Sequence, residues 1–317
     1  MPSFHNKKQY TVAFYNLENL FDTYDDELTQ DNEFLPDSVK KWTFKRYLNK
    51  LRKLGFAISQ IGENETGFPP ALVGLSEVEN ELVLRDLISS QHLAHIHYDF
   101  VHFDSPDERG IDVALLYNKK VFHKLKASRH ALDIFNVDGE KDYTRDILHV
   151  SGLFDGEKVH VIVNHWPSRR EGLEESNIKR MAASNKVMEI METILYEEPE
   201  AKFIILGDFN DNPDTESIKN LVNNQDLFNP MEQVYSKSRG TTRHDFVWDL
   251  FDQIILSTSF FERIPGTLTY LKADIFDEDF LKLFRGPFKG EPFRTYVGTK
   301  YKGGYSDHFP VYLILHK

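Results

Sequence analysis

The stretch KFIILGDFNDNP, from Lys202 to Pro213, joins a predicted core strand to a cluster of polar side chains. Its apolar run, Phe203 to Leu206, combines aromatic, β-branched and leucine residues, as is typical of a strand buried on both faces. Gly207 then permits a tight bend, and two aspartates and two asparagines follow before the proline prevents further pairing. Asp208 and Asn210 are therefore delivered at the end of a rigid strand, although a polar turn without chemistry has the same pattern.

Five other stretches carry polar residues at or near the end of a predicted strand. They are Asn16 after Tyr10–Tyr15, Glu77 after Ala71–Leu75, His165 after Lys158–Val163, Asp252 within Trp248–Ser257, and Asp307 with His308 before Val311–Leu315. Each has a structural explanation when taken alone, but side chains at one edge of a packed sheet converge on one cleft. An aspartate within an apolar strand is also costly to bury alone, so Asp252 needs a partner. We expect these residues to form one site.

The pattern between these stretches predicts how the strands connect. Tyr98–Phe103 and Ile111–Tyr117 are predicted to form a hairpin, and Asp155-Gly156 predicts a second one. A helix from about Glu175 to Tyr196 links the strand before His165 to the strand of the opening stretch. A strand-helix-strand unit of this kind favours parallel pairing of its two strands.

Two segments are less clear. Asp37 is predicted to open a helix that runs to about Ile61, with a basic face that includes Lys50. We expect that face to be solvated rather than to bind an anionic partner. Residues 259–300 show no pattern from which we can predict regular structure.

Composition indicates a globular protein with an acidic surface. Of the 317 residues, 40% are hydrophobic and 13% are aromatic, which supports a large packed core. No linker or charge block divides the chain, so we expect a single domain over residues 1–317. The net charge of −12 argues against a broad electrostatic surface for nucleic acid, whose non-specific affinity comes mainly from Lys and Arg. Any affinity for phosphate must then be local.

The chain contains no cysteine, so any metal ion must be bound by oxygen or imidazole ligands. Oxygen ligands favour Mg²⁺ or Mn²⁺, which are commonly held by one or two carboxylates together with a substrate phosphate. No run of apolar residues is long enough to span a membrane, and no signal peptide is apparent. We therefore expect a cytoplasmic protein, and we expect a monomer.

Taken in order, these residues resemble the endonuclease/exonuclease/phosphatase superfamily, which includes deoxyribonuclease I. The resemblance rests on Asn16, Glu77, GDFN at Gly207–Asn210, DQIILS from Asp252, and SDHFP at Ser306–Pro310. It implies an α/β fold, a four-layer α-β-β-α sandwich of two mixed sheets. It also implies Mg²⁺-dependent cleavage of phosphate esters by in-line attack of water, with Mn²⁺ as the alternative metal.

The resemblance implies a role for each site residue. Glu77 would be the principal metal ligand, with Asn16 and Asp307 close to the metal. Asp208 would orient or deprotonate the attacking water, Asn210 would hold the phosphate, and Asp252 would orient His308, which stabilises the reacting phosphate. His165 matches a second histidine of the deoxyribonuclease I and sphingomyelinase members, and Arg145 resembles a phosphate-contacting arginine. Arg169 and Arg170 are candidates for substrate binding because of their position after His165 at the same strand end, and not because of the resemblance.

Three functions compete at this stage. The leading one is a metal-dependent phosphodiesterase of the nuclease type, acting on DNA or RNA. A phosphatase or a sphingomyelinase-like hydrolase of a smaller phosphoester is favoured by the acidic net charge. A catalytically silent binding module on the same fold is the third, because fold does not imply function. A silent relative should lack Glu77, Asp208 or His308, and all three are present.

Overall fold

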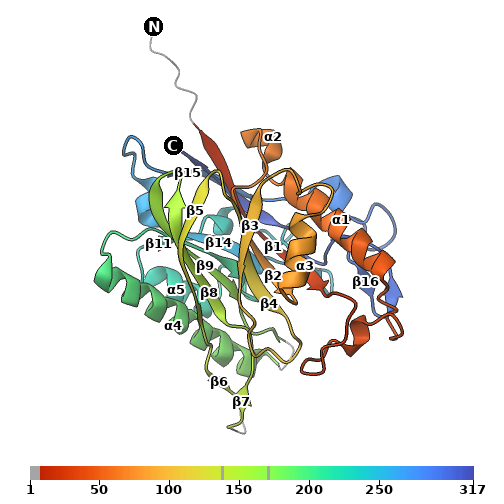
Figure 1. The fold of residues 1–317 in the computed structure, drawn as a ribbon. Coiled ribbons are helices and arrows are strands. Elements are labelled where there is room, and N and C mark those ends of the chain that lie inside the picture. Colours follow the sequence, from red (N-terminus) through yellow and green to blue (C-terminus); the bar gives the residue numbers. More distant parts are fainter. Residues whose placement is uncertain (1–7, 137–138, 170–171) are drawn as a thin grey trace.

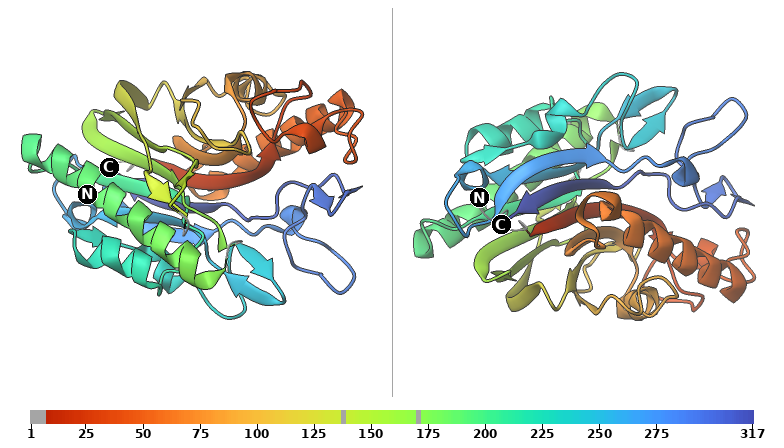
Figure 2. Two further views of the ribbon diagram at one scale, coloured as in Figure 1. Left: turned by 90° about the horizontal axis from the view of Figure 1, so that it is seen from below. Right: turned by 90° about the horizontal axis from the view of Figure 1, so that it is seen from above.

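The structure is a computed structural model that describes residues 8–136, 139–169 and 172–317. Two six-stranded mixed sheets face each other, and helices cover the outer side of each sheet (Figures 1 and 2). The layers therefore follow the order α-β-β-α. This confirms the predicted fold class.

The first sheet has the strand order β15-β18-β1-β2-β4-β3. Its strands are β1 (Gln9–Leu20), β2 (Leu72–Val78), β3 (Tyr98–His102), β4 (Asp112–Asn118), β15 (Thr269–Ile275) and β18 (Val311–His316). β1 and β2 pair in parallel, and the other neighbours are antiparallel. The hairpin predicted from residues 98–117 is confirmed as β3 and β4.

The second sheet has the strand order β11-β14-β10-β9-β8-β5. Its strands are β5 (Phe122–His130), β8 (Ile147–Phe154), β9 (Glu157–His165), β10 (Phe203–Asp208), β11 (Leu227–Phe228) and β14 (Asp252–Ser257). β8 and β9 form the hairpin predicted at Asp155-Gly156, and β9 pairs with β10 in parallel as predicted.

Helices lie on the two outer faces (Figure 2). They are α1 (Phe44–Gln60), α2 (Glu63–Thr66) and α3 (Glu81–Ile88) near the first sheet, and α4 (Leu173–Glu197) and α5 (Glu216–Asn223) on the second. Three small hairpins are β6–β7 (Ile134–Phe135, Lys141–Asp142), β12–β13 (Thr242–His244, Val247–Asp249) and β16–β17 (Tyr296–Val297, Lys300–Tyr301). Short 3-10 helices cover Asn32–Phe34, Pro230–Gln233, Thr258–Phe261 and Asp279–Leu281.

Alternation along β10 decides which way its side chains point. Phe203 and Ile205 pack in the core beneath α4 and α5, whereas Ile204 and Leu206 pack in the core between the two sheets. Successive side chains of a strand point to opposite faces, so Asp208 shares the face of Ile204 and Leu206. The carboxylate therefore emerges between the sheets, at the end of the buried strand.

Two glycines allow close packing near this strand end. A Cβ on Gly207 would lie 2.4 Å from the Asn164 carbonyl oxygen of the neighbouring β9. A Cβ on Gly74 of β2 would lie 2.0 Å from Leu206 Cδ1 of the opposite sheet. Both positions need a residue without a side chain, because backbone and core atoms occupy the space that a Cβ requires. The two sheets are thus held close together where the polar residues begin.

Several local predictions were wrong. The first helix begins at Phe44 rather than Asp37, and its Lys50 is buried with only 1% exposure, not solvated. Residues 259–300 contain the full strand β15, which no pattern predicted. The strand predicted over 248–257 is divided into β13 and β14.

Within the described part of the chain, no helix is both long and apolar enough to span a membrane.

Candidate active site

Three predicted site residues lie side by side on adjacent strands of the second sheet. Asp208 on β10 is in register with His165 on β9 and with Asp252 on β14. Residues directly opposite each other on neighbouring strands project from the same face. His165 Nε2 lies 3.7 Å from Asp208 Oδ2, and all three side chains are buried. Sheet register therefore creates this row.

His308 completes a hydrogen-bonded pair with Asp252, the partner that the sequence required. His308 Nδ1 donates to Asp252 Oδ2 at 2.7 Å and lies 4.0 Å from Asp208 Oδ2. Burial lowers the pKa of His308, but the two carboxylates outweigh it and raise the pKa well above its usual value. The neighbouring carboxylates therefore favour the protonated imidazole, and Asp252 sets its orientation.

Asn16 connects the first sheet to this row. Its Nδ2 donates to Asp208 Oδ2 at 3.0 Å, across the space between the sheets. The backbone amide of Asn210 donates to the other carboxylate oxygen, Asp208 Oδ1, at 2.9 Å. Burial, followed by the nearby charge of Asp252, raises the pKa of Asp208 to about 6. This carboxylate is thus held from both sheets.

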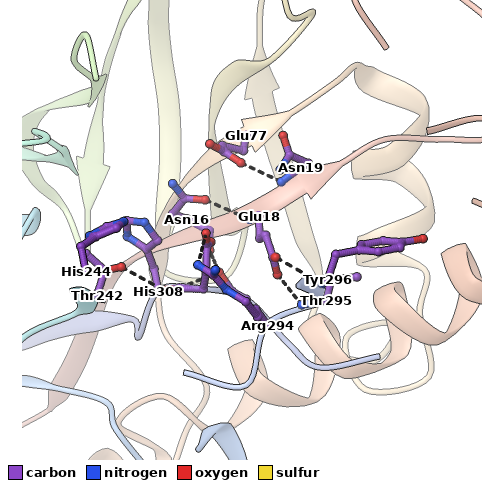
Figure 3. Close-up of polar contacts among 12 residues, drawn as sticks. Asn16, Glu18, Asn19, Glu77, Thr242, His244, Arg294, Thr295, Tyr296 and His308 are labelled. Atoms are coloured by element: carbon purple, nitrogen blue, oxygen red, sulfur yellow. Dashed lines mark hydrogen bonds and ion pairs between the residues drawn. The ribbon is translucent and has the colours of Figure 1, made fainter. Parts of the chain in front are cut away.

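Glu77 lies at a paired irregularity where β1 and β2 both leave regular geometry. The register shifts from Asn16 opposite Ser76 to Leu20 opposite Val78, so three residues of β1 lie against one residue of β2. Glu77 has φ 59°, in the left-handed region that side chains rarely adopt. The bulge turns its carboxylate toward the end of β1, where it accepts a hydrogen bond from the Asn19 amide at 2.8 Å (Figure 3).

Asp307 and Glu77 each face an arginine that sequence reasoning missed. Arg294 Nη2 donates to Asp307 Oδ2 at 3.0 Å, and Arg109 Nη2 lies 3.4 Å from Glu77 Oε1. Burial opposes ionisation of Asp307, but His308 and Arg294 outweigh it and lower the pKa of the carboxyl group. Arg294 comes from the segment for which the sequence offered no pattern, and Arg109 from a predicted turn.

The predicted phosphate-binding residues meet at the backbone of Trp166, next to His165. Asn210 Nδ2 donates to the Trp166 carbonyl at 2.9 Å, and Arg145 Nη2 donates to the same oxygen at 3.1 Å. Arg145 is buried and also pairs with Asp107 at 3.0 Å. The structure therefore places Arg145 beside the row of site residues, with its charge already partnered.

Arg169 supports the loop after β10 rather than pointing away from the protein. Its Nε donates to the Asn210 carbonyl at 3.0 Å, and its Nη2 donates to Asp211 Oδ1 at 3.1 Å. Asp211 also pairs with the fully buried Arg180 of α4 at 2.7 Å. These contacts fix the loop that carries Asn210. Arg170 lies outside the described residues.

A buried lysine and glutamate, which the sequence did not single out, lie behind the site. Lys50 Nζ donates to Thr295 Oγ1 at 2.5 Å and lies 3.8 Å from Glu18 Oε2. The Glu18 carboxylate accepts a hydrogen bond from the Thr295 amide at 2.5 Å (Figure 3). The pair therefore joins the irregular end of β1 to the segment that carries Arg294.

The site contains groups that could hold a metal ion. Ligand atoms of Asp208, Asp252 and His308 all lie within 4.8 Å of one another. Asn16 and Glu77 lie near each other at the end of β1 and supply further oxygen atoms (Figure 3). A second group of this kind in the described chain, His102 with Asp104 and Asp112, lies on β3 and β4 and was not predicted.

Comparison with known proteins defines the class of protein that this fold and site represent. The model of the Endonuclease/Exonuclease/phosphatase family matches residues 11–317. The chain therefore belongs to the endonuclease/exonuclease/phosphatase family, as the sequence motifs implied. No curated protein matches the chain at a significant level.

Three solved structures illustrate the range of the fold. An endonuclease/exonuclease/phosphatase family protein from Bacteroides thetaiotaomicron has a TM-score of 0.61 at 17% identity, covering 98% of this chain and 96% of that one. A mannosyl-6-phosphatase from the same organism has a TM-score of 0.59 at 16% identity, covering 96% and 99%. TDP2 from D. rerio, complexed with a single-strand DNA product, has a TM-score of 0.56 at 14% identity, covering 98% and 99%.

Proposed function

We propose that the protein is a metal-dependent phosphodiesterase of the nuclease type, which hydrolyses its substrate by in-line attack of water. The observation that carries this proposal is the row of His165, Asp208 and Asp252 on three adjacent strands, completed by His308 on Asp252 and Asn16 on Asp208. Such a row provides a base, a fixed cation and hydrogen-bond donors within one buried cluster, as phosphoryl transfer requires.

Each residue is assigned a role from its contacts. Asp208 orients and deprotonates the attacking water, since two amide groups fix its oxygens. His308 stabilises the charge that develops on the phosphate, and Asp252 holds the imidazole in position. His165 lies beside Asp208 and faces the same phosphate. Asn210 binds a phosphate oxygen, Arg169 supports the loop that carries Asn210, and Arg145 holds the Trp166 carbonyl that Asn210 also contacts.

Asn16, Glu77 and Asp307 would hold Mg²⁺. The donor set fits a hard cation, because it consists of carboxylate and amide oxygens and includes no sulfur. When bound, Mg²⁺ supplies positive charge to the phosphate oxygens. Mn²⁺ is the alternative ion. We further propose that residues 1–317 act as one domain and as a monomer.

A phosphatase for a smaller phosphoester is the second candidate. The net charge of −12 disfavours a long polyanion, and one protein of similar fold is a mannosyl-6-phosphatase. The Asp252–His308 pair acts on one phosphate, and the residues that would hold Mg²⁺ lie at the same site, so the same residues serve either substrate. The two candidates differ in whether the phosphate carries a second ester bond.

A hydrolysis panel separates the candidates. Single-stranded DNA, RNA, a phosphodiester chromophore and a phosphomonoester chromophore are each incubated with Mg²⁺, Mn²⁺ or a chelator. We expect turnover of the diesters with either metal and none with chelator. Hydrolysis confined to the monoester would replace the proposal with the phosphatase, and hydrolysis of nothing in the panel would favour a silent module.

A further inference from the structure

The segment from Lys282 to Lys302 differs in charge from the rest of the chain. It contains six basic residues and one acidic residue, a net charge of +5 within a chain of net charge −12. It also contains five aromatic residues. Interleaved basic and aromatic side chains are the composition with which proteins bind single-stranded nucleic acid, because cations meet phosphates and rings stack on bases.

The hairpin β12–β13 connects this segment to the active site. Thr242 Oγ1 donates to the Asp307 carbonyl at 3.1 Å, and Trp248 stacks on Phe309 with ring centroids 6.0 Å apart. His244, the last residue of β12, lies beside His308 (Figure 3). The base of the hairpin is therefore part of the site wall, and its tip projects beyond it.

The tip meets the basic segment through two exposed aromatic rings. Phe246 and Phe288 are 62% and 49% exposed, and their rings stack 5.9 Å apart at 10°. Arg243 Nη1 donates to Glu291 at 3.1 Å and secures the contact. The pair presents flat apolar surface to solvent at the edge of the site. The views in Figure 2 show the hairpin and the segment at the same end of the molecule.

The backbone at the tip is a two-residue hairpin turn that presents Phe246. Asp245 and Phe246 are the residues between β12 and β13, and they have φ 46° and 65°. A two-residue type I′ turn requires positive φ at both positions, so the turn accounts for this backbone conformation. Gly, Asn and Asp are the residues that such turns prefer, and a phenylalanine with an exposed ring contributes little to a core. Neither the turn nor packing therefore explains the aromatic ring at position 246.

Four cations of the segment are free to meet phosphates. Arg285, Lys289, Lys300 and Lys302 have no ion pair among the residues that the structure describes. Another part of the surface is unsuitable for a polyanion. A cavity of about 870 Å³ lies beside Glu79 and Asp107, and its lining includes seven acidic residues and no lysine or arginine. A strand of phosphates would be repelled from that side and drawn toward the segment.

We propose that Phe246 and Phe288, together with the Lys282–Lys302 segment, form a binding surface for single-stranded nucleic acid. An unpaired base stacks on the aromatic pair, and the flanking phosphates contact the free cations, so that one phosphate reaches the site beside His308. This inference rests on the proposed phosphodiesterase function and specifies where its substrate lies.

The test compares two probes that carry the same phosphates but differ in bases. One is a fluorescently labelled single-stranded DNA oligomer, and the other is an oligomer of the same length whose sugars carry no bases. Anisotropy is measured with chelator present, so that neither probe is cleaved. We expect wild type to bind the base-bearing probe more tightly, and Phe246→Ala to weaken that binding roughly tenfold while changing the base-free probe little.

Matched variants separate stacking from other effects. Phe246→Trp should retain the affinity for the base-bearing probe, and Phe246→Leu should not, because leucine keeps apolar bulk but has no π face. Phe68→Ala removes a ring that is 70% exposed before β2, at the end of the strand opposite Glu77, and should change nothing. Lys289→Glu with Lys300→Glu should weaken both probes. All variants alter exposed positions, and their unfolding midpoints are compared with wild type.

Three results would overturn the proposal. They are equal affinity of wild type for the two probes, equal losses on both probes in Phe246→Ala, and binding of phosphatidylcholine or mixed phosphatidylserine vesicles that requires Phe246. The last would assign the tip to a membrane surface. Turnover of a small diester chromophore is recorded in parallel. If it persists, failure concerns the binding surface alone, and if it is absent in wild type, the phosphodiesterase proposal fails first.

Discussion

Asp252 is fully buried, and its carboxylate accepts a hydrogen bond from the His308 imidazole at 2.7 Å. A buried carboxylate without a partner is costly, and a buried imidazole needs a fixed orientation to act on a phosphate. The imidazole is therefore the partner that the buried carboxylate needs, and the carboxylate fixes the orientation of the imidazole. We expect the two side chains to act as one unit.

We expect Asp252→Asn and His308→Ala each to lower kcat/KM by roughly 10²- to 10⁴-fold, the range for loss of one positioned catalytic group. The double variant should lose little more than the worse single variant, because residues that act as one unit are not additive. Steady-state kinetics on a diester chromophore provides the measurement. Multiplicative losses in the double variant would show two independent roles.

We expect Glu77→Gln to weaken Mg²⁺ binding by at least about tenfold, since the change removes a charge but preserves the shape of a hard-cation ligand. Isothermal titration of Mg²⁺ into wild type and variant measures this without turnover. Glu81→Gln on α3 is the control, because Glu81 is exposed and, among the residues that the structure describes, forms its ion pair with the exposed Arg85. Equal affinities for wild type and Glu77→Gln would remove Glu77 from the metal site.

At the level of secondary-structure elements, a chain of histidines crosses three strands of the second sheet. Its links are Glu198 to His160 at 3.3 Å, His160 to His149 at 3.0 Å, His149 to Ser128 at 3.4 Å, and Ser128 to His130 at 3.1 Å. A carboxylate only accepts, so His160 Nε2 donates to Glu198 and His160 Nδ1 accepts from His149 Nε2. Each neutral ring then donates one hydrogen bond in the direction of Glu198. A ring that gains a second proton has no acceptor nitrogen left, so it can no longer accept the hydrogen bond from its neighbour.

Acid should therefore weaken the fold at this chain. Burial lowers the pKa of His149 to about 4, with nearby His160 the next cause, and burial also lowers the pKa of His160. Because the unfolded chain binds the proton near pH 6.5, the unfolding free energy falls as pH drops from about 6.5 to about 4. The loss from His149 is about 3.5 kcal/mol at most, at about 1.4 kcal/mol for each pKa unit between about 6.5 and about 4.

Urea unfolding at several pH values checks this prediction. His149→Gln cannot gain a proton, so it should show a shallower decline in unfolding free energy across that range than wild type. His123→Gln, on the exposed face of the same sheet's β5, is the control and should follow wild type. A wild-type slope in His149→Gln would contradict the assignment.

For the whole molecule, charge sets how strongly a nucleic acid can bind. The net charge of −12 repels a polyanion at long range, and the Lys282–Lys302 segment offers a local exception. Binding should then involve few phosphates. The shape of the fold is unaffected by this balance, but the strength and salt dependence of substrate binding follow from it.

We expect the affinity of an inactive Asp208→Asn variant for single-stranded DNA to fall only gently with salt. Two to four neutralised phosphates correspond to a log–log slope of about −1.5 to −3, at roughly −0.7 per contact. Binding titrations at a series of salt concentrations give the slope. A slope near −7 would indicate about ten contacts and an extended DNA surface.

The local sequence pattern was sufficient to predict features that depend on residues close together in the chain. The apolar run before Asp208, the Asp155-Gly156 hairpin and the parallel pairing of β9 with β10 all follow from periodicity and turn residues, and the structure confirms them. The need of Asp252 for a partner was likewise predictable, because burying a lone carboxylate is unfavourable in any fold. The motifs at strand ends then identified the family and the fold class.

Tertiary structure decided the features that depend on residues far apart in the chain. Lys50 is buried because Glu18, Thr295 and Tyr305 surround its ammonium group, whereas its helix alone predicts a solvated face. The ring of Phe246 stacks on Phe288 because the fold brings the β12–β13 hairpin against the Lys282–Lys302 segment. Periodicity reports which face of an element is apolar, but it carries no information about which distant segment arrives to cover a charge or a ring.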